Sequence, residues 1–326
     1  MTARVLAQKI AGPITIAHRG ASGYLPEHTL EAKALSIGMG ADFVEQDIVI
    51  TKDGIPIVTH DIFLEDVTDI AAHFPDRNRV DGHYYAIDFK IAELKTLSRY
   101  ERIDDAGKTV FPGRFPPTSC RFAVVTLSEE IEFVQGINRS AGKNVGLYTE
   151  VKFPAWHREQ GHDITRITLD TLARHGYTRR ADNAYFQCFD AMELKRVRGE
   201  LGCDLKLIQL IGENAWNESS TDYDAMRTER GMAEVAAYAD GIGPEITQIV
   251  EWKRPQVAPC VQDLARLAHA LRLKIHPYTF RTDQLPPNAP DAKSVLDALF
   301  DQANVDGIFT DFTDRVVAYL KARAAR

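Results

Sequence analysis

The chain has 326 residues, of which 44% are hydrophobic and 26% charged, a composition typical of a folded globular protein rather than a disordered one. Its 39 Lys and Arg against 46 Asp and Glu give a formal net charge of −7, which argues against nucleic acid as a partner. No apolar run approaches the ~20 residues of a membrane span, so we expect no stable membrane insertion. The length allows two domains, or one barrel of about 250 residues with an insertion.

Short apolar segments with strand character alternate along the chain with amphipathic stretches. The candidate strands are Ile14–Ala17, Phe43–Ile50, Ile55–Thr59, Gly146–Val151, Ala184–Phe189, Lys206–Ile211, Gly241–Gly243, Lys274–Phe280 and Gly307–Thr310. The turn sequence Thr51-Lys52-Asp53-Gly54 predicts a hairpin, in which Ile55–Thr59 runs antiparallel to the strand before it. The eight remaining strands predict an α/β protein of the (β/α)8 TIM-barrel class.

Helices are predicted between these strands by capping pairs and apolar spacing. Thr126 with Glu129 forms a capping-box pattern ahead of an apolar stretch, and Ser294 with Asp297 is expected to open a similar helix. Spacing of i, i+3, i+4 and i+7 predicts a third helix on Leu264, Leu267, Ala268 and Leu271.

Residues 61–118 interrupt the strand and helix alternation. The segment is rich in aromatic and turn-forming residues and ends with Pro112-Gly113 and Pro116-Pro117. A structureless loop of this length is improbable in a compact domain, so we predict a small subdomain, inserted after the second barrel strand at the barrel mouth, that walls a substrate cleft. A surface decoration is the alternative. Residues 1–60 and 119–326 would form the barrel.

Glu45 and Asp47 lie two apart in a predicted strand, so both carboxylates face the same side. Glu150 and Lys152 repeat this arrangement in the next barrel strand. Three carboxylates at neighbouring strands make a hard oxygen site suited to Mg²⁺ or Ca²⁺. The alternative is a set of polar barrel residues neutralised by an arginine.

His18 and His60 each close a predicted strand, and active sites of barrels lie at the carboxyl ends of their strands. Each histidine precedes a charged residue, Arg19 or Asp61, and the pair would bracket the carboxylates. This pattern favours an acid–base pair, with Arg19 as a planar donor to a phosphate oxygen. Together these residues indicate metal-assisted chemistry on a phosphate ester.

Further candidates for substrate contacts lie on later segments. Gln187 and Tyr278 are candidate cleft-lining side chains. Phe189 shares the Gln187 face, with barrel filling as its alternative role. Trp252 lies in a loop-like stretch, where it either walls the pocket or covers the edge of the core.

The stretch His18-Arg19-Gly20-Ala21-Ser22-Gly23-Tyr24-Leu25-Pro26-Glu27-His28-Thr29 resembles the glycerophosphodiester phosphodiesterase family. The resemblance continues, in order, through 45–47, 52–54, 59–61, 74–77, 84–89, 132–136, 187–190, 238–244 and 276–281. Most of that family has Asn at the position of His28, whereas the bacterial periplasmic-type branch has His, so the chain resembles that branch.

The resemblance implies a barrel with an insertion after its second strand. It implies that the three carboxylates bind a divalent cation, with Ca²⁺ favoured and Mg²⁺ the alternative. It further implies that the two histidines are the general acid and base, while Arg19 and Lys152 contact the phosphate.

The implied substrates are small-molecule glycerophosphodiesters such as glycerophosphocholine or glycerophosphoethanolamine, cleaved to sn-glycerol 3-phosphate and an alcohol. The first nucleophile, water or the neighbouring glycerol hydroxyl, and the oligomeric state stay open. Two alternatives remain: a related barrel phospholipase D, sphingomyelinase-D-like, acting on intact lipids, and a non-catalytic glycerophosphodiester-binding protein.

The first ten residues contain no recognisable signal peptide, because Gln8 and Lys9 interrupt the apolar stretch. The chain as written is therefore expected in the cytoplasm. The branch resemblance implies the periplasm instead, if a signal segment is removed.

Overall fold

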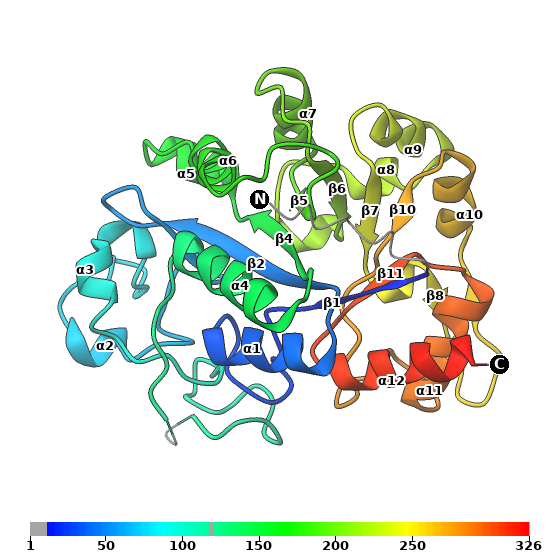
Figure 1. The fold of residues 1–326 in the computed structure, drawn as a ribbon, viewed down its shortest axis with the longest axis horizontal. Helices are drawn as coiled ribbons and strands as arrows, with labels where there is room; N and C mark the ends of the chain where they lie inside the picture. The colour runs from blue at the N-terminus through cyan, green and yellow to red at the C-terminus, as the bar shows by residue number, and fades with distance from the viewer. Residues whose placement is uncertain (1–11, 118–119, 326) are drawn as a thin grey trace.

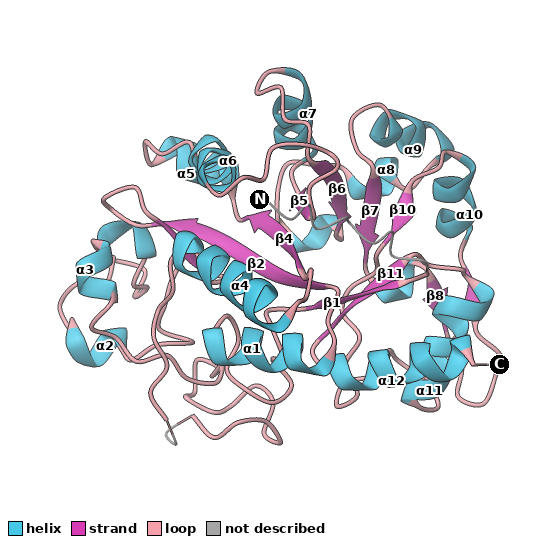
Figure 2. Ribbon diagram, in the orientation of Figure 1, coloured by secondary structure: helices cyan, strands magenta, loops and turns pink. Residues whose placement is uncertain are grey.

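The structure, a computed structural model, describes residues 12–117 and 120–325. Eight parallel strands form the interior and helices surround them (Figure 1, Figure 2). Their order around the sheet is β10-β7-β6-β5-β4-β2-β1-β11. The bounds are Ile14–Ala17 (β1), Phe43–Ile50 (β2), Gly146–Val151 (β4), Ala184–Cys188 (β5), Lys206–Ile211 (β6), Gly241–Pro244 (β7), Lys274–Ile275 (β10) and Gly307–Thr310 (β11). The predicted (β/α)8 barrel is confirmed.

The barrel closes between β10 and β11 without a regular ladder. β10 is shorter than predicted, and the chain beyond it reaches β11 through an isolated parallel bridge between Phe280 and Thr310. The Phe280 amide donates to the Phe309 carbonyl at 2.8 Å, and the Asp306 amide to the Ile275 carbonyl at 3.0 Å. We call this junction the seam.

The predicted hairpin is present. β3 (Pro56–Val58) pairs antiparallel with the end of β2, with Val49 opposite Ile57, and is not a member of the barrel. A second small antiparallel pair, β8 (Val250–Glu251) with β9 (Cys260–Val261), lies after β7.

The helices follow the strands as a barrel requires. Their bounds are Leu30–Met39 (α1), Leu127–Ala141 (α4), Pro154–Glu159 (α5), Ile164–Arg174 (α6), Ala191–Gly199 (α7), Tyr223–Met226 (α8), Glu229–Ala236 (α9), Asp263–Ala270 (α10), Ala292–Asp297 (α11) and Thr313–Ala324 (α12). Short 3₁₀ turns cover Asn214–Trp216 (η2) and Ile246–Gln248 (η3), and a π-helical turn covers Ala298–Gln302 (η4).

The capping box predicted for α4 is present, since the Thr126 side chain accepts a hydrogen bond from the Glu129 amide. The predicted start of α11 is wrong by one turn. Asp291 caps this helix by accepting from the Ser294 amide at 2.7 Å, so Ser294 lies inside the helix. Asp291 is the better cap because its carboxylate also suits the positive end of the helix dipole.

The barrel interior is layered. Alternate residues of each strand face inward, and the lower layer is apolar, with Phe43, Tyr148, Ile208 and Phe309 in one cluster. The polar residues that follow on the same faces form the layer toward the carboxyl ends of the strands. This layering concentrates charged side chains at the barrel mouth.

Residues 61–117 lie beside the long β2 strand (Figure 1) and contain α2 (Ile70–His73), η1 (Ala86–Asp88) and α3 (Ile91–Leu94). They share a hydrophobic cluster with the hairpin, in which Phe89 and Leu94 pack with Val49 and Ile57. The division into barrel and insertion stays a prediction, and its 118/119 boundary lies outside the described residues. The expected signal-free N-terminus, residues 1–10, also lies outside them.

Across residues 12–117 and 120–325, no helix combines the length and the apolar character needed to cross a membrane.

Candidate active site

Strand register brings the predicted carboxylates together. Asp47 of β2 lies opposite Glu150 of β4, and Glu150 lies opposite Gln187 of β5. Glu45 is two residues before Asp47, on the same inward face. Oxygen atoms of Glu45, Asp47 and Glu150 all lie within 4.8 Å of one another. The spacing within each strand and the register between strands together produce this cluster, which we call the carboxylate cluster.

The carboxylate cluster fits a divalent cation. Its three members are almost completely buried, and Asp47 Oδ1 has no hydrogen-bond partner in the described structure. Burial and the charges of Asp47 and Glu150 raise the pKa of Glu45 well above its usual range. Burial likewise raises the pKa of Glu150 to about 8, although the Lys152 ammonium opposes the shift. Without a cation, burial and mutual repulsion keep protons on neighbouring acids such as these. A bound divalent cation would favour their ionised forms, so this arrangement is the one expected at a cation site.

Asp47 behaves differently from its two neighbours. Burial would raise the pKa of this carboxyl, but His28 and other basic neighbours hold it well below its usual range. His28 Nε2 lies 2.9 Å from Asp47 Oδ2. Asp47 therefore stays ionised.

Both predicted histidines are held by carboxylates through Nδ1. Nδ1 of His18 is 2.6 Å from Asp311 Oδ1, and Nδ1 of His60 is 2.7 Å from Asp61 Oδ1. Burial lowers the pKa of His18 to about 4, and burial with the nearby cations lowers the pKa of His60. A neutral imidazole with its proton on Nδ1 carries its lone pair on Nε2, which is the atom that can accept a proton.

Two cations flank the carboxylate cluster. The Arg19 amide donates to Glu45 Oε2 at 2.9 Å, and its guanidinium Nε lies 3.4 Å from Asp47 Oδ2. The Lys152 ammonium donates to Glu150 at 2.7 Å and lies 3.3 Å from His60 Nε2. Arg19 adopts a positive φ of 58° at the turn after β1, which directs both its amide and its side chain toward the cluster.

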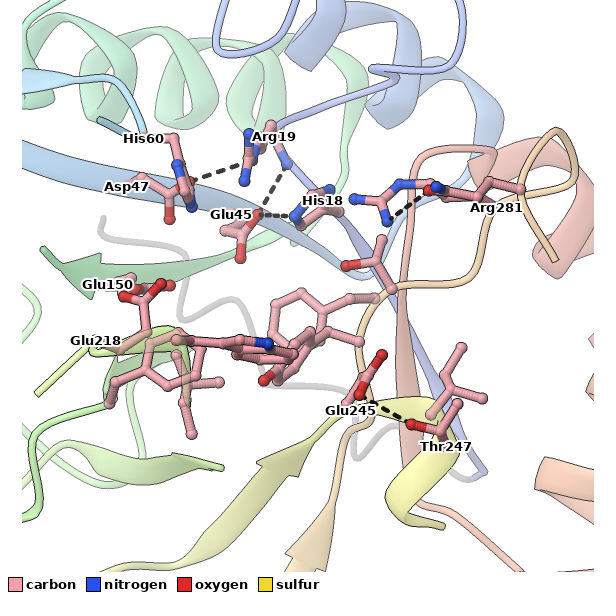
Figure 3. A pocket seen from close by; sticks show the side chains of 18 of the residues that line it. His18, Arg19, Glu45, Asp47, His60, Glu150, Glu218, Glu245, Thr247 and Arg281 are labelled. Carbon is pink, nitrogen blue, oxygen red and sulfur yellow. Dashed lines mark hydrogen bonds and ion pairs between the residues drawn. The ribbon is translucent and has the colours of Figure 1, made fainter. Parts of the chain in front are cut away.

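One cavity of about 470 Å³ is lined by the carboxylate cluster, His18, His60, Arg19 and Lys152 (Figure 3). Tyr278, a candidate cleft-lining residue, also lines it, as does Phe189, for which barrel filling was the alternative; their contact with substrate stays a prediction. Gln187 is fully buried and is not part of the lining, but its amide donates to Glu45 Oε1 at 3.1 Å. The structure does not bring Trp252 here. That ring is 2% exposed in the core outside the cavity, because a large apolar side chain after β8 is buried more favourably there.

The walls of the cavity differ from those predicted. None of the described residues 61–117 lines it. The walls come instead from the segments after β6, β7 and β10, with Trp216, Glu218, Glu245, Thr247 and Arg281. Figure 3 shows Glu218 next to Glu150, and Glu245 with Thr247 on the opposite side of the cavity. The segment 61–117 instead contacts residues next to the cavity: its Arg102 forms ion pairs with Asp61 at 2.6 Å and with Glu27 at 2.8 Å.

Sequence reasoning missed several of these residues. Asp311 comes directly after the last barrel strand, as His18 comes directly after the first. That shared position could have predicted that the two side chains lie close together. His28 was noticed only as part of a motif, without a role. Glu218 and Glu245 lie in segments without hydrophobic periodicity, so nothing in the sequence distinguishes them from other surface acids.

The mouth of the eight-stranded parallel barrel holds the carboxylate cluster, two histidines fixed by carboxylates, and the positively charged side chains of Arg19 and Lys152. This combination is typical of an enzyme that cleaves phosphate esters. The chain belongs to the glycerophosphoryl diester phosphodiesterase family, whose model matches residues 18–315.

Relatives agree along nearly the whole chain. A glycerophosphodiester phosphodiesterase of Haemophilus influenzae is 44% identical over 94% of this chain and 90% of its own length. One from Treponema pallidum is 35% identical over 94% and 91%. The family match and these relatives support glycerophosphodiester phosphodiesterase activity for this chain.

Solved structures share the fold. A crystal structure from Silicibacter pomeroyi superposes with a TM-score of 0.71 at 24% identity, covering 96% of this chain and 94% of the other. A phosphodiesterase of Oleispira antarctica, solved in complex with the product sn-glycerol-3-phosphate, gives a TM-score of 0.64 at 20% identity, covering 95% and 97%.

Proposed function

We propose that this protein is a cation-dependent hydrolase of glycerophosphodiesters that releases sn-glycerol 3-phosphate by acid–base catalysis with His18 and His60. One observation carries the proposal. Two imidazoles, each fixed through Nδ1 by a carboxylate, share a cavity with the carboxylate cluster, Arg19 and Lys152.

The residues divide the reaction between them. One imidazole, neutral at the start of the step, takes a proton from the attacking hydroxyl through Nε2. The other enters the step as an imidazolium, having taken up a proton from solvent, and gives its Nε2 proton to the oxygen of the leaving alcohol. The bond between phosphorus and the leaving oxygen breaks as the new phosphorus–oxygen bond forms. The Arg19 guanidinium and the Lys152 ammonium bind the non-bridging oxygens and stabilise the charge that grows on them.

Glu45, Asp47 and Glu150 would hold the divalent cation, and their all-oxygen donor set suits Ca²⁺, which we favour, or Mg²⁺. When bound, the cation supplies positive charge that polarises the phosphodiester. Gln187 and the Arg19 amide fix the Glu45 side chain in this cluster, with hydrogen bonds of 3.1 and 2.9 Å.

The direct test replaces each histidine. We expect His18→Ala and His60→Ala each to lower kcat for glycerol 3-phosphate release about 100- to 10,000-fold, because each removes one proton-transfer group. His73→Ala is the matched control, since His73 also faces a carboxylate, at 3.4 Å from Asp69, but lies in α2 outside the cavity. Near-normal turnover by both cavity variants would contradict the proposed roles.

The first nucleophile can be identified with a modified substrate. A glycerophosphodiester that lacks the glycerol hydroxyl next to the phosphate cannot form a cyclic phosphate. Its turnover at a normal rate would assign the attack to water, whereas its complete resistance would assign the attack to that hydroxyl.

We further propose that the leaving group is a cationic alcohol such as choline or ethanolamine. Glu245 lines the cavity, accepts a hydrogen bond from Thr247 at 2.8 Å and has no ion-pair partner within the described residues. Its backbone forms a parallel bridge with that of Tyr278, which also lines the cavity and whose ring lies 5.9 Å from that of Phe189. A carboxylate beside aromatic rings is suited to an ammonium group.

Trp216 extends this aromatic surface toward solvent. It is 44% exposed, and a Cβ added to Gly212 would lie 3.2 Å from its ring and 3.4 Å from the ring of Phe189. The two rings therefore pack against the same glycine, and both line the cavity, where a methylated ammonium group can contact them.

A further inference from the structure

The segment 61–117 contributes a buried arginine to the surroundings of a catalytic histidine. We propose that Arg114 is a positioning residue, which holds the Asp311 carboxylate in the orientation that fixes the His18 imidazole. This inference rests on the proposed function, in which His18 transfers a proton.

Asp311 is 1% exposed and uses its two oxygens for different partners. Oδ1 faces His18 Nδ1 at 2.6 Å. Oδ2 accepts hydrogen bonds from Arg114 at 2.7 Å and from Arg281 at 2.8 Å. Because two guanidinium groups occupy Oδ2, the carboxylate cannot rotate without losing both, and Oδ1 is left for the histidine.

Arg114 is itself held rigidly, so it is a suitable anchor. Its side chain is 4% exposed, and the guanidinium lies 3.6 Å from the centre of the Phe111 ring. It also donates to Asp283 at 2.9 and 3.2 Å and to the Ser22 carbonyl at 3.3 Å. Each of its three nitrogens therefore has a fixed acceptor, and one of these acceptors is Asp311.

Arg114 and Arg281 differ in what they can touch. Arg281 lines the cavity and can contact substrate directly, whereas Arg114 is not part of the lining. An effect of Arg114 on turnover is therefore indirect, and its 2.7 Å hydrogen bond to Asp311 points to a route through Asp311 and His18. The segment 61–117 thus contacts Asp311 through Arg114 and does not form a wall of the cavity.

The test compares Arg114→Ala with Arg114→Lys. We expect Arg114→Ala to lower kcat about 10-fold with little change in KM, because substrate contacts are intact while the imidazole is less well oriented. Arg114→Lys should recover part of the loss, since an ammonium can still donate to Asp311. The downfield proton resonance of the His18–Asp311 hydrogen bond, assigned by its absence in His18→Ala, should weaken or move in Arg114→Ala.

Arg79→Ala is the matched control. Arg79 also lies in the inserted segment, bonds Asp88 at 2.7 and 3.0 Å, and stacks 4.2 Å from the centre of the Tyr85 ring. It is expected to leave both kcat and the resonance unchanged. A loss of kcat that the two variants share would mean general damage to the segment and would overturn the proposal.

A double variant separates positioning from loss of stability. In an Asp311→Asn background, Arg114→Ala should lower kcat hardly further, because the group through which it acts is already altered. Independent losses that multiply would overturn the proposal, as would normal kcat in Arg114→Ala. Full activity of His18→Ala would instead refute the proposed function on which this inference rests.

Discussion

Glu101 is a buried carboxylate that forms no ion pair with the described basic residues. It is 3% exposed, and its Oε2 has no hydrogen-bond partner in the described structure. Burial and the charge of Glu27 raise the pKa of Glu101 to about 8. The folded protein therefore keeps a proton on this group that the unfolded chain releases near pH 4.5.

This difference predicts a pH-dependent loss of stability. As pH rises from about 4.5 to about 8, the unfolded chain binds fewer protons than the folded protein, so the free energy of unfolding falls. Glu101→Gln removes that fall and should be more stable than the wild type by on the order of 2 kcal/mol at pH 9, with little gain at pH 4. Urea unfolding at both pH values measures this, and an equal gain at the two would contradict it.

Glu245 gives a prediction about selectivity. Glu245→Gln removes the charge but keeps a side chain that can still accept from Thr247. We expect kcat/KM for glycerophosphocholine to fall about 10-fold relative to that for glycerophosphoglycerol, whose head group is neutral; this change corresponds to about 1.4 kcal/mol. Glu251→Gln, an exposed carboxylate outside the cavity, should leave the ratio unchanged. An equal fall on both substrates would show that Glu245 binds the shared glycerol moiety.

Single residues were predictable from the sequence where strand spacing or a motif pointed to them. Glu45 and Asp47 were found because a period of two places them on one face, and His18 because it ends a strand. Asp311 was not found, because it meets His18 across 293 residues of sequence and only barrel closure brings the two together.

Among the elements, α4 offers a direct test of a local sequence rule. Its capping box joins Thr126 and Glu129, whose side chains each accept from the other's amide at 3.2 and 2.8 Å. Thr126→Ala should lower the free energy of unfolding by about 1 kcal/mol, because the Glu129 amide loses its acceptor. Ser140→Ala at the exposed end of the same helix is the control, and the urea midpoints of both variants measure the effect.

Strand positions were predictable because buried parallel strands are short apolar runs with clear turn residues around them. The walls of the cavity were not. They come from segments after β6, β7 and β10, where the backbone follows tertiary contacts and no hydrophobic period marks the side chains that point inward. Trp252 shows the same limit, since its loop-like sequence did not reveal that the core covers the ring.

For the whole molecule, the proposed cation site in the carboxylate cluster would link cation binding to stability. Oxygens of three buried acids lie within 4.8 Å of one another, so ionising all three is costly in the protein alone, and a bound divalent cation would offset that cost. Chelation should abolish activity and lower Tm, and Ca²⁺ or Mg²⁺ should restore both. A cation at 100 times its Kd adds about 2.7 kcal/mol of stability.

Asp47→Asn supplies the control for this experiment. It weakens the cation site, so its Tm should respond far less to chelator or cation than that of the wild type. A wild-type Tm that is the same with chelator and with excess cation would contradict a cation site in the cluster.

The seam between β10 and β11 has a mechanical consequence. Arg281 follows the β10 side and Asp311 follows the β11 side, so their 2.8 Å hydrogen bond spans the junction where the barrel has no ladder. Opening at this point would pull the two residues apart and loosen the carboxylate that fixes His18. The integrity of the barrel wall and the orientation of the His18 imidazole therefore depend on the same few hydrogen bonds, and protection of the Phe280 amide from hydrogen exchange reports on both.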